Sequence, residues 1–563
     1  MANRRIGSFH SGVSRRTFLG AGAAGGAALL TGGAASLLPA GTASAAPSDP
    51  IWMERSIPQL QALLNSGALS SVELTLGYLA RIARLNPVLN AVIEINPNAV
   101  AIAAQLDGER RQRRGLRGPL HGIPILIKDN IATDDQMQTT AGSLALLGSK
   151  VPADAVLVAR LRAAGAIILG KANLGEWANF RGFNPLGFNG WSARGGATHN
   201  PYLLDYTAYG SSSGPAVAAA ANLCAAAVGT ETDGSIVAPS NANLVVGLKP
   251  TLGLVSQAGI IPISHRQDTA GPMGRTVTDV AVLLGVLQSP FGWAVGQSPP
   301  VDYTQFLRRR ALKGKRIGVD RRFRDDYDTY GYPGDGDTLA YFDQALAAMQ
   351  SLGATLVDTD TGDIYSYFGD EFTALLFEFK ADVEKYLKSL TRTRMRTVGD
   401  LMAFNLAHCS AEMPYYGQEL FEMAESTGGN LADPAYIAAR LAARSAARSG
   451  IDNALDALNL DAIVAPHLTN TTAPAVAGYP SLALPVGITP AGKPAGMLMY
   501  SGFLEEAELI GFAYDLEQAL NVRRKPQLLG AVNDPPNAGI CAAPETRAGS
   551  SSRVLVPRGR IFG

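Results

Sequence analysis

The chain has 563 residues, of which 47% are hydrophobic and only 17% are charged. Such a chain buries a large core as one oversized domain or two, and it does not have the composition of a disordered protein. The chain contains 48 basic residues (lysine and arginine) and 48 acidic residues (aspartate and glutamate). Its net charge therefore does not attract nucleic acid, an anionic membrane or an acidic partner. This balance suits a small neutral substrate, and we expect a monomer that binds no nucleic acid.

The first 45 residues have the pattern of an export signal. Arg15 and Arg16 precede an apolar stretch rich in glycine and alanine that runs to Ala40, and Ala43-Ser44-Ala45 follows. This pattern is typical of a twin-arginine signal peptide with a small-residue cleavage site. A transmembrane anchor is the alternative, but the stretch contains few leucines. We therefore expect cleavage after Ala45, export to the periplasm or the extracellular space, and no stable membrane anchor.

Helical and strand patterns alternate in the next part of the chain. Regularly spaced leucines predict helices over residues 57–85, with an interruption near Gly67. The apolar stretch Ile123–Ile127 predicts a buried strand. Residues 154–164 have helical spacing, Gly165 ends that pattern, and Ala166–Leu169 is typical of a strand. This alternation with short connections predicts a layered α/β core.

Two glycine-rich loops that carry serines follow. The first is Gly210-Ser211-Ser212-Ser213-Gly214, and the second is Gly229–Ser235. Between them, Pro215–Val228 consists almost entirely of small apolar residues and begins with a proline suited to the first turn of a helix, so it predicts a buried helix. Glycine frees the backbone at both bends and lets a substrate approach closely.

These loops and Lys128 together indicate nucleophilic chemistry on a carbonyl group. A serine hydroxyl is a weak nucleophile until a base removes its proton, and backbone N–H groups in a glycine bend stabilise the resulting oxyanion. Lys128 follows the strand predicted at Ile123–Ile127, and burial disfavours its ammonium form, so it is a candidate base near neutral pH. Taken singly, each feature is more often structural, because such lysines are usually solvated and such loops are usually turns.

Ordered motifs over most of the chain resemble the amidase signature family, and within it the bacterial peptide amidases. The likeness spans roughly residues 52–530. The matching segments are Gly118–Pro124, Lys128–Asn130, Thr139–Ser143, Leu169–Asn173, Trp191–Gly196, the two serine loops, Val246–Thr251, Asp268–Met273 and Ala477–Pro480. The resemblance implies an α/β domain at residues 50–530, with a large mixed β-sheet covered by helices on both faces. It also implies an amide hydrolase that needs no metal or cofactor.

The family's functional residues are carried over residue by residue. Its catalytic lysine falls on Lys128, its bridging serine on Ser211 and its nucleophile on Ser235. In this family the bridging serine follows a cis peptide bond, which here is the bond between Gly210 and Ser211. The implied mechanism is two-step covalent catalysis through an acyl-enzyme. The implied oxyanion donors are the backbone N–H groups of Thr232, Asp233, Gly234 and Ser235.

Two departures from the general family pattern resemble peptide amidases and not amidotransferase subunits. Asp233 stands where the family usually has glycine, and Val237 where it usually has arginine. The resemblance thus implies release of ammonia from C-terminal peptide carboxamides, with a broader aliphatic or aryl amidase as the alternative. The role of Asp233 is open between shaping the loop and binding substrate. Four residues before the first serine loop are candidates either for the pocket or for the core: Trp177, Asn179, Phe180 and Trp191.

Two other classes of function compete with this interpretation. Gly210–Gly214 also fits the Gly-x-Ser-x-Gly elbow of α/β-hydrolase esterases, with Ser212 as the nucleophile. An elbow requires an apolar strand before it, whereas Asp205–Tyr209 is polar and mixed. It also requires a downstream histidine, for which the sequence offers His265, His408 and His467. The second class is a non-catalytic amide-binding protein, which the retention of all three candidate catalytic residues disfavours.

Residues 281–460 are more charged and more helical, with a strand predicted at Arg316–Val319. This region is a candidate lid or wall of the substrate site, and plain packing is the simpler interpretation. Cys224 is predicted to be a core residue, and a bridge between Cys409 and Cys541 is compatible with an oxidising compartment.

Residues 531–563 are rich in proline, alanine, glycine and serine and are predicted to form a flexible tail. Near their end, Leu555–Gly559 resembles a protease site of engineered origin, so we assign it no function.

Overall fold

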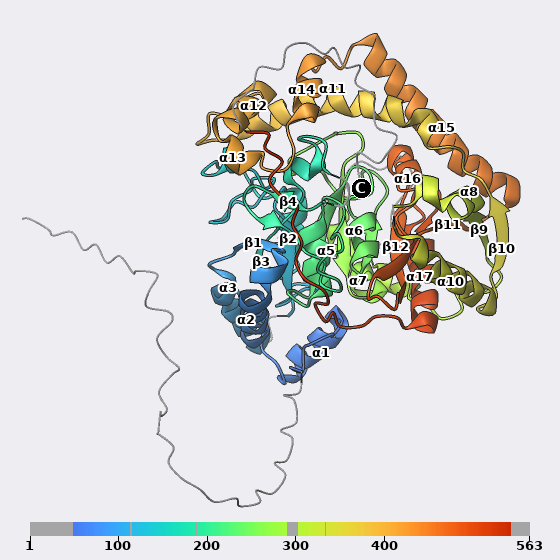
Figure 1. Cartoon of the computed structure of the whole chain (residues 1–563). Coiled ribbons are helices and arrows are strands. Elements are labelled where there is room, and N and C mark those ends of the chain that lie inside the picture. Colours follow the sequence, from blue (N-terminus) through green and yellow to red (C-terminus); the bar gives the residue numbers. More distant parts are fainter. Residues whose placement is uncertain (1–48, 113–114, 186–187, 290–301, 333, 542–563) are drawn as a thin grey trace, which may run out of the picture. The chain divides into compact units, whose positions relative to one another are not determined.

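A mixed β-sheet of eleven strands forms the centre of the computed structural model (Figure 1). The structure describes residues 49–541 except 113–114, 186–187, 290–301 and 333, and all structural statements refer to these residues. The predicted export signal and the last part of the predicted tail lie outside the described residues.

The strands are β1 (Val92–Ile95), β2 (Pro124–Lys128), β3 (Ile167–Ala172), β4 (Trp191–Ser192), β5 (Gly196–Ala197), β6 (Ala226–Glu231), β7 (Val246–Lys249), β8 (Thr269–Gly274), β9 (Arg316–Asp320), β10 (Thr355–Thr359), β11 (Ala462–Pro466), β12 (Ser481–Ile488) and β13 (Pro494–Tyr500). The α-helices are α1 (Ile57–Ser66), α2 (Ser71–Leu89), α3 (Ala99–Arg111), α4 (Val156–Ala163), α5 (Ser213–Ala220), α6 (Val237–Ala242), α7 (Val277–Leu287), α8 (Arg321–Asp325), α9 (Tyr327–Tyr330), α10 (Leu339–Ser351), α11 (Tyr365–Ser389), α12 (Val398–Ala407), α13 (Cys409–Glu412), α14 (Glu419–Ser426), α15 (Pro434–Leu458), α16 (Thr472–Ala477) and α17 (Glu506–Leu520). Short 3-10 helices occur at Leu144–Leu146, Glu176–Asn179, Tyr303–Phe306 and Gly336–Thr338.

The strand order in the large sheet is β1-β3-β2-β6-β8-β7-β12-β13-β11-β9-β10. Strand β2 lies between β3 and β6 and is parallel to both, with Ile125 beside Ile168 and Ala226. All five residues of β2 are buried, and strands buried on both faces are continuously apolar. Because these three strands run in the same direction, their carboxyl ends lie at one edge of the sheet, where Lys128 and Glu231 end β2 and β6.

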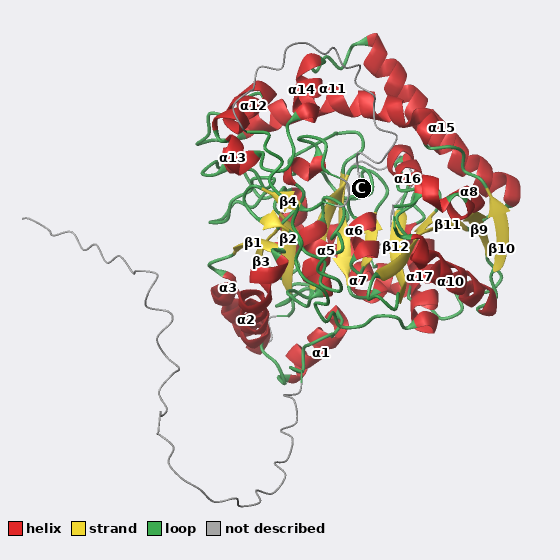
Figure 2. Ribbon diagram, in the orientation of Figure 1, coloured by secondary structure: helices red, strands yellow, loops and turns green. Residues whose placement is uncertain are grey.

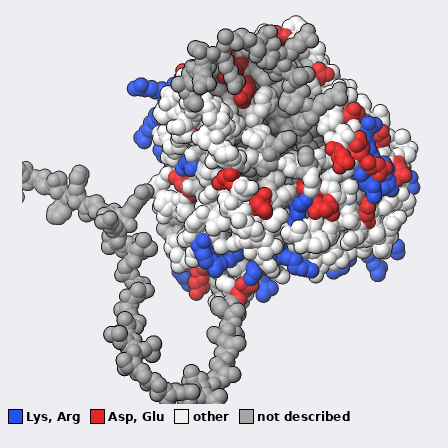
Figure 3. All heavy atoms as spheres, viewed as in Figure 1, with Lys and Arg blue, Asp and Glu red and all other residues white. Residues whose placement is uncertain are grey.

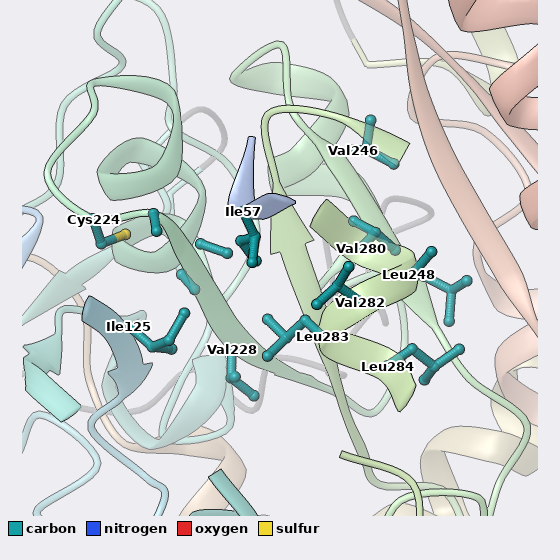
Figure 4. Close-up of a cluster of buried hydrophobic side chains, with 14 of the residues drawn as sticks. Ile57, Ile125, Cys224, Val228, Val246, Leu248, Val280, Val282, Leu283 and Leu284 are labelled. Carbon is teal, nitrogen blue, oxygen red and sulfur yellow. The ribbon is translucent and has the colours of Figure 1, made fainter. Parts of the chain in front are cut away.

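Helices cover both faces of the sheet, which confirms the predicted architecture (Figure 2). Leu482 and Leu484 of β12 belong to the largest buried cluster, together with side chains of α7, α10 and α17. The intervening Ala483 belongs to a different cluster, together with side chains of α15 and α16. Successive side chains of a strand point to opposite faces, so the two clusters are the two layers of core. Figure 4 shows part of the first cluster, including Val280 of α7 and Leu248 of β7.

Strongly periodic segments form the elements that the sequence predicts. The two helices expected in residues 57–85 are α1 and α2, and Gly67 ends the first with a left-handed φ of 74°. The helix at 154–164 and the strand at 166–169 are α4 and β3. The strand predicted at Arg316–Val319 is β9.

The run between the two serine loops is only half helical, so the prediction of one helix over Pro215–Val228 is wrong. Helix α5 ends at Ala220, Asn222 takes a left-handed φ of 54°, and the chain re-enters the sheet at Ala226 as β6. A run of small apolar residues has no periodicity that separates a buried helix from a buried strand. Pairing with β2 and β8 selects the strand.

Residues 281–460 are mainly helical, and the long helices α11 and α15 lie side by side in this region (Figure 1). Phe379 and Leu387 of α11 form a separate buried cluster with Phe421 of α14. The same cluster includes Trp177 and Phe180, which lie in the loop before the first serine loop. This helical region is therefore packed directly on the loop that contains these two predicted pocket residues.

A disulfide joins Cys409 to Cys541, whereas Cys224 is a buried free thiol. The backbone N–H of Ala538 also donates to the carbonyl of Pro414 at 2.7 Å. These contacts attach Ala538 and Cys541, in the first part of the predicted tail, to the α13 region. Local composition does not reveal this attachment, because the bridge joins residues 132 positions apart.

Removal of this disulfide is expected to lower the free energy of unfolding by about 2–4 kcal/mol, because a cross-link over a long loop restricts the unfolded chain. The measurement is guanidinium unfolding of the wild type and of a Cys409→Ser, Cys541→Ser double variant, with and without reductant. Reductant should lower the stability of the wild type to that of the variant and leave the variant unchanged. Equal stability of the two oxidised proteins would contradict this expectation.

Basic and acidic side chains are intermixed on the face of the molecule that Figure 3 draws. This distribution agrees with the equal totals of the two kinds of charge. None of the helices in the described ranges is long and apolar enough to cross a membrane.

Candidate active site

Lys128 ends β2 inside the protein and has no exposed surface. Its Nζ lies 2.7 Å from Ser211 Oγ and 3.1 Å from Ser212 Oγ. It also lies 2.9 Å from Thr230 Oγ1 and 3.3 Å from the carbonyl oxygen of Thr230. The structure thus brings the predicted base to the first serine loop and to the neighbouring strand β6, as the sequence predicts.

The buried position of Lys128 makes it a base near neutral pH. Burial lowers the pKa of its ammonium group to about 7, and the negative charges of Asp268 and Glu231 oppose this shift only in part. Above pH 7 the neutral amine is therefore the main form. A neutral amine accepts a proton from a serine hydroxyl, whereas an ammonium group only donates.

The first serine loop turns at Gly210, which has a left-handed φ of 59°. A Cβ at this position would lie 2.4 Å from Pro239 Cδ, so only glycine fits. The described chain contains no cis peptide bond, so the cis bond predicted between Gly210 and Ser211 is absent. The physical reason is that glycine reaches the left-handed region at little cost, whereas a cis bond without proline costs about 3–4 kcal/mol.

Hydrogen bonds of the Ser212 side chain connect the first serine loop to β6. Its hydroxyl donates to the carbonyl of Thr230 at 2.9 Å and accepts from the N–H of the same residue at 3.2 Å. Its backbone N–H donates to the carbonyl of Ser235 at 3.2 Å, which joins the two serine loops directly. Ser212 is therefore held as a structural link between the loops.

Ser235 lies in the second loop with 6% of its surface exposed, and its hydroxyl forms no hydrogen bond with the described residues. The backbone around it is held by Glu231, whose carboxylate accepts from the N–H groups of Gly234 at 3.0 Å, Ile236 at 2.7 Å and Val237 at 3.0 Å. The N–H of Gly234 donates to Glu231 in this structure, and its role as an oxyanion donor stays a prediction. The corresponding roles of Thr232, Asp233 and Ser235 stay predictions.

Glu231 is a positioning residue that sequence reasoning missed. Burial raises the pKa of its carboxyl group, and the charge of buried Lys249 opposes that shift. Gly234 has a φ of 74°, and a Cβ there would lie 3.0 Å from Thr471 Oγ1, so the loop packs closely against Thr471. An acidic residue followed closely by glycine and serine was the available signal in the sequence.

Substitution of Glu231 with glutamine is expected to lower kcat more than it raises KM, because the amide retains only one acceptor oxygen for three N–H groups. The free energy of unfolding should fall by about 1.5–3 kcal/mol for a lost hydrogen bond to a charged group. Steady-state kinetics and chemical unfolding of the variant test both effects. Unchanged kcat in a variant of lowered stability would show that Glu231 supports only the fold.

Further polar residues surround Lys128. Asn130 Nδ2 donates to Thr230 Oγ1 at 2.9 Å, and Thr232 Oγ1 donates to Asp268 Oδ1 at 2.6 Å. Burial raises the pKa of Asp268 to about 7. These four side chains and Ala178 line a cavity of about 10 Å³, which is close to the space that one water occupies.

Asp233 is buried two residues before Ser235, and its Oδ2 accepts a hydrogen bond from Thr472 Oγ1 at 2.6 Å. This contact attaches the second serine loop to the start of α16. Asp233 therefore helps to hold the shape of the second serine loop, which is one of the two roles that the sequence left open.

The loop of the predicted pocket residues has an unusual backbone. Trp177, Ala178 and Asn179 all have left-handed φ values, between 52° and 66°. For residues other than glycine this conformation costs about 1–3 kcal/mol each and persists only where the surroundings enforce it. The N–H of Gly175 donates to the carbonyl of Ser211 at 3.1 Å, so this loop abuts the first serine loop.

The four predicted pocket residues are all buried. The ring of Phe180 packs at a tilt against that of Phe379, with centroids 4.8 Å apart, and Trp177 packs edge-on against Phe421. These two aromatic rings are parts of the core. Asn179 is bonded within its own loop, where its side chain donates to Asn189 and accepts from Asn184.

Trp191 packs against a fully buried arginine. The guanidinium of Arg181 lies 5.3 Å from the ring centroid of Trp191 and 4.1 Å from that of Tyr416. The same guanidinium pairs with Glu176 at 2.5 Å. Trp191 therefore helps to join the strained loop to the helical region.

The histidines required by the esterase elbow lie elsewhere. His265 is paired with Asp382 at 2.7 Å, and His408 stacks on Phe404. His467 Nδ1 accepts a hydrogen bond from the backbone N–H of Gly496 at 3.1 Å. Within the described chain no strand leads into the first serine loop, because β5 ends at Ala197 and α5 is the next element. Geometry thus disfavours Ser212 as a nucleophile.

No group of three or more histidine, cysteine, aspartate or glutamate residues that would hold a metal ion occurs in the described ranges.

A buried lysine beside two serine loops, at the carboxyl edge of a mixed sheet, is an arrangement suited to an amide hydrolase. Comparison with known proteins agrees. The chain belongs to the amidase family, whose family model, Amidase, matches residues 73–510. Members of this family hydrolyse C–N amide bonds, and the family predicted from the sequence motifs is confirmed.

Relatives from plants, fungi and bacteria are similar over most of their length. A probable amidase of Arabidopsis thaliana is 39% identical over 484 residues, which cover 84% of this chain and 92% of that protein. A putative amidase of Schizosaccharomyces pombe is 35% identical over 516 residues, which cover 84% of this chain and 86% of that protein. The crystal structure of the peptide amidase from Stenotrophomonas maltophilia is 47% identical, with a TM-score of 0.79 over 85% of this chain and 100% of that chain.

Proposed function

We propose that the protein is a peptide amidase that converts C-terminal peptide carboxamides to free acids and ammonia. The observation that carries the proposal is the fully buried Lys128, which is bonded to Ser211 and has a pKa near 7. The similarity to a peptide amidase at 47% identity supports the substrate class. Equal numbers of acidic and basic residues agree with a substrate that is neutral at its reacting end.

The proposed reaction has two steps. Neutral Lys128 takes the proton of Ser211, Ser211 takes that of Ser235, and Ser235 Oγ bonds to the carboxamide carbon. The proton then passes back through Ser211 to the carboxamide nitrogen, and the C–N bond breaks. Ammonia departs, and the acyl group remains bound to Ser235 as an ester. Water then attacks the ester, gives its proton to the same relay and releases the acid. The Ser235 hydroxyl must close on Ser211 when substrate binds, since catalytic hydrogen bonds often tighten only in the complex.

An ammonia-release assay tests the substrate class. The enzyme is given a dipeptide amide, free glutamine and an aliphatic amide at equal concentrations. We expect kcat/KM to be highest for the dipeptide amide. A preference for glutamine or for the aliphatic amide would overturn the peptide amidase proposal while leaving the amidase family intact.

We also propose that residues 1–45 direct export by the twin-arginine route, so that the enzyme acts in the periplasm or outside the cell. The disulfide between Cys409 and Cys541 supports this proposal, because disulfides persist mainly in oxidising compartments. N-terminal sequencing of protein recovered from outside the cytoplasm should begin at Ala46. Recovery of a chain that begins at Met1 would overturn the proposed processing.

A further inference from the structure

Three arginines line a small cavity between α11, α15 and the loop that precedes β8. The cavity has a volume of about 30 Å³, and its polar lining consists of Arg266, Gln267, Glu371, Glu378, Arg440 and Arg444. Arg440 and Arg444 are four residues apart on α15 and therefore lie on one face of that helix. Arg266 approaches them from the loop, because its Nε lies 3.2 Å from the hydroxyl of Tyr436 and the Arg440 guanidinium lies 5.8 Å from the ring centroid of the same tyrosine. The three guanidinium groups thus surround one small space.

Two of these arginines have no acidic partner. Arg440 Nε is buried and forms no hydrogen bond with the described residues. The half-buried guanidinium of Arg444 likewise forms no hydrogen bond or ion pair with a residue of the described ranges. Burial and the charges of neighbouring arginines lower the pKa of Arg444. Buried polar atoms of native proteins nearly always have a partner, and an exception requires an explanation such as a ligand.

The two carboxyl groups of the lining do not neutralise this pair of arginines. Glu378 pairs with Arg266, with 3.6 Å between Oε1 and Nε, and so offsets that arginine. Burial raises the pKa of the Glu371 carboxyl group well above its ordinary value, which favours its neutral form. The guanidinium groups of Arg440 and Arg444 therefore keep a net positive charge at the cavity.

The size and the donors of the cavity suit a carboxylate. Its volume of about 30 Å³ is about two to three times the 10–15 Å³ that one water requires, so it matches the two oxygens of a carboxylate better than the four of a phosphate. A guanidinium group presents parallel N–H donors that bind both oxygens of a carboxylate. The Arg266 side chain is 44% exposed, so this lining residue is reached from solvent.

Two walls of the cavity contact the second serine loop. Gln267, one lining residue, donates from Nε2 to the carbonyl of Thr232 at 3.0 Å. Val476 of α16 also lines the cavity, and Thr472 of the same helix donates to Asp233 at 2.6 Å. A ligand in the cavity therefore lies one layer of side chains away from the loop that carries the candidate nucleophile.

We propose that Arg440 and Arg444, supported by Arg266, bind a carboxylate group in this cavity. Two sources supply this chemistry: an acidic side chain in the acyl part of a peptide amide substrate, and a separate carboxylate molecule. The first source rests on the proposed function and makes the enzyme prefer acidic peptide amides. The second does not depend on turnover.

The experiment compares the whole wild-type enzyme with Arg444→Gln and Arg448→Gln in two arms. The first arm measures kcat/KM for N-acetyl-glutamyl-leucine amide and N-acetyl-glutaminyl-leucine amide, which differ only in one charged group. The second arm measures the melting temperature in sodium acetate and in sodium chloride of equal ionic strength. Arg448 is the matched control, because it continues the same row of α15 but lies outside the lining, where its Nε donates to the carbonyl of Ala477 at 2.9 Å.

We expect the glutamate-to-glutamine ratio of kcat/KM to fall by about tenfold in Arg444→Gln, the size of a lost charge-assisted hydrogen bond. The ratio should stay within about twofold of the wild type in Arg448→Gln. This result assigns the carboxylate to the substrate. An unchanged ratio, with a melting temperature that acetate raises in the wild type and not in Arg444→Gln, assigns it to a separate molecule.

Two outcomes would overturn the carboxylate site. One is that Arg444→Gln matches the wild type in both arms, and the other is that Arg448→Gln changes the ratio or the acetate effect as much as Arg444→Gln does. Wild-type turnover of the glutamine-containing amide is measured first. Its absence contradicts the proposed function, whereas the acetate arm still tests the carboxylate site because it requires no turnover.

Discussion

Substitution of Ser235 with alanine is expected to lower kcat for amide hydrolysis by a factor on the order of 10⁴ or more, because the acyl-enzyme is then unable to form. Ser235 lies in a loop whose backbone is fixed by Glu231 and by Ser212, so loss of its hydroxyl leaves the fold in place. Ammonia release by the variant measures the effect. A fluorophosphonate should label the wild type at Ser235, as found by mass spectrometry, and should leave the variant unlabelled.

Ser213→Ala is the matched control for this substitution. Ser213 is buried in the first serine loop, and its hydroxyl has no hydrogen-bond partner in the described part of the chain. Replacement by alanine removes an unsatisfied polar group, so turnover should stay close to that of the wild type. Retention of activity in Ser235→Ala, with its loss in Ser212→Ala, would instead favour the esterase elbow.

Substitution of Lys128 with methionine is expected to abolish turnover at all pH values, and the wild type should show a pH dependence set by this group. The pKa of Lys128 is about 7, so the neutral base predominates above that pH and kcat/KM should reach a plateau there. Below it, kcat/KM should fall by about tenfold per pH unit as the amine is protonated. A pH–rate profile of both proteins measures the effect, and a flat profile from pH 5 to about 8 would contradict the assignment.

Stability provides a control that separates catalysis from folding. Because the folded-state pKa of Lys128 is lowered from 10.5, the unfolded chain binds more protons than the folded one between about pH 7 and that value. This group therefore makes stability rise with pH in that window, and it opposes folding near pH 7. Lys128→Met removes the opposing contribution, so the inactive variant should be at least as stable as the wild type. A clear loss of stability would assign Lys128 a structural role.

The part of the candidate site that could be predicted from the sequence consists of chemically reactive residues that follow a recognisable local pattern. An apolar strand ending in lysine predicts a buried base, and β2 places Lys128 against Ser211 as expected. The glycine-rich bends offered several serines, and the resemblance to the amidase signature family implied Ser235 as the nucleophile. The supporting roles of Glu231 and Thr230 were not predicted, because these roles depend on hydrogen bonds that form only in the folded chain; for Glu231 the sequence offered only the weak signal of an acidic residue before glycine and serine.

By itself, the sequence determined the α/β class, the family, and the helices and strands whose hydrophobic period is strong, such as α1, α2 and β9. Periodicity and motif order are local properties, so they can be read from the chain. Tertiary structure alone decided that Ala226–Val228 is a strand, that the bond before Ser211 is trans, and that Glu231 holds the backbone of the second serine loop. The physical reason is that an alanine-rich run has no period and that contacts between distant segments depend on how the layers pack.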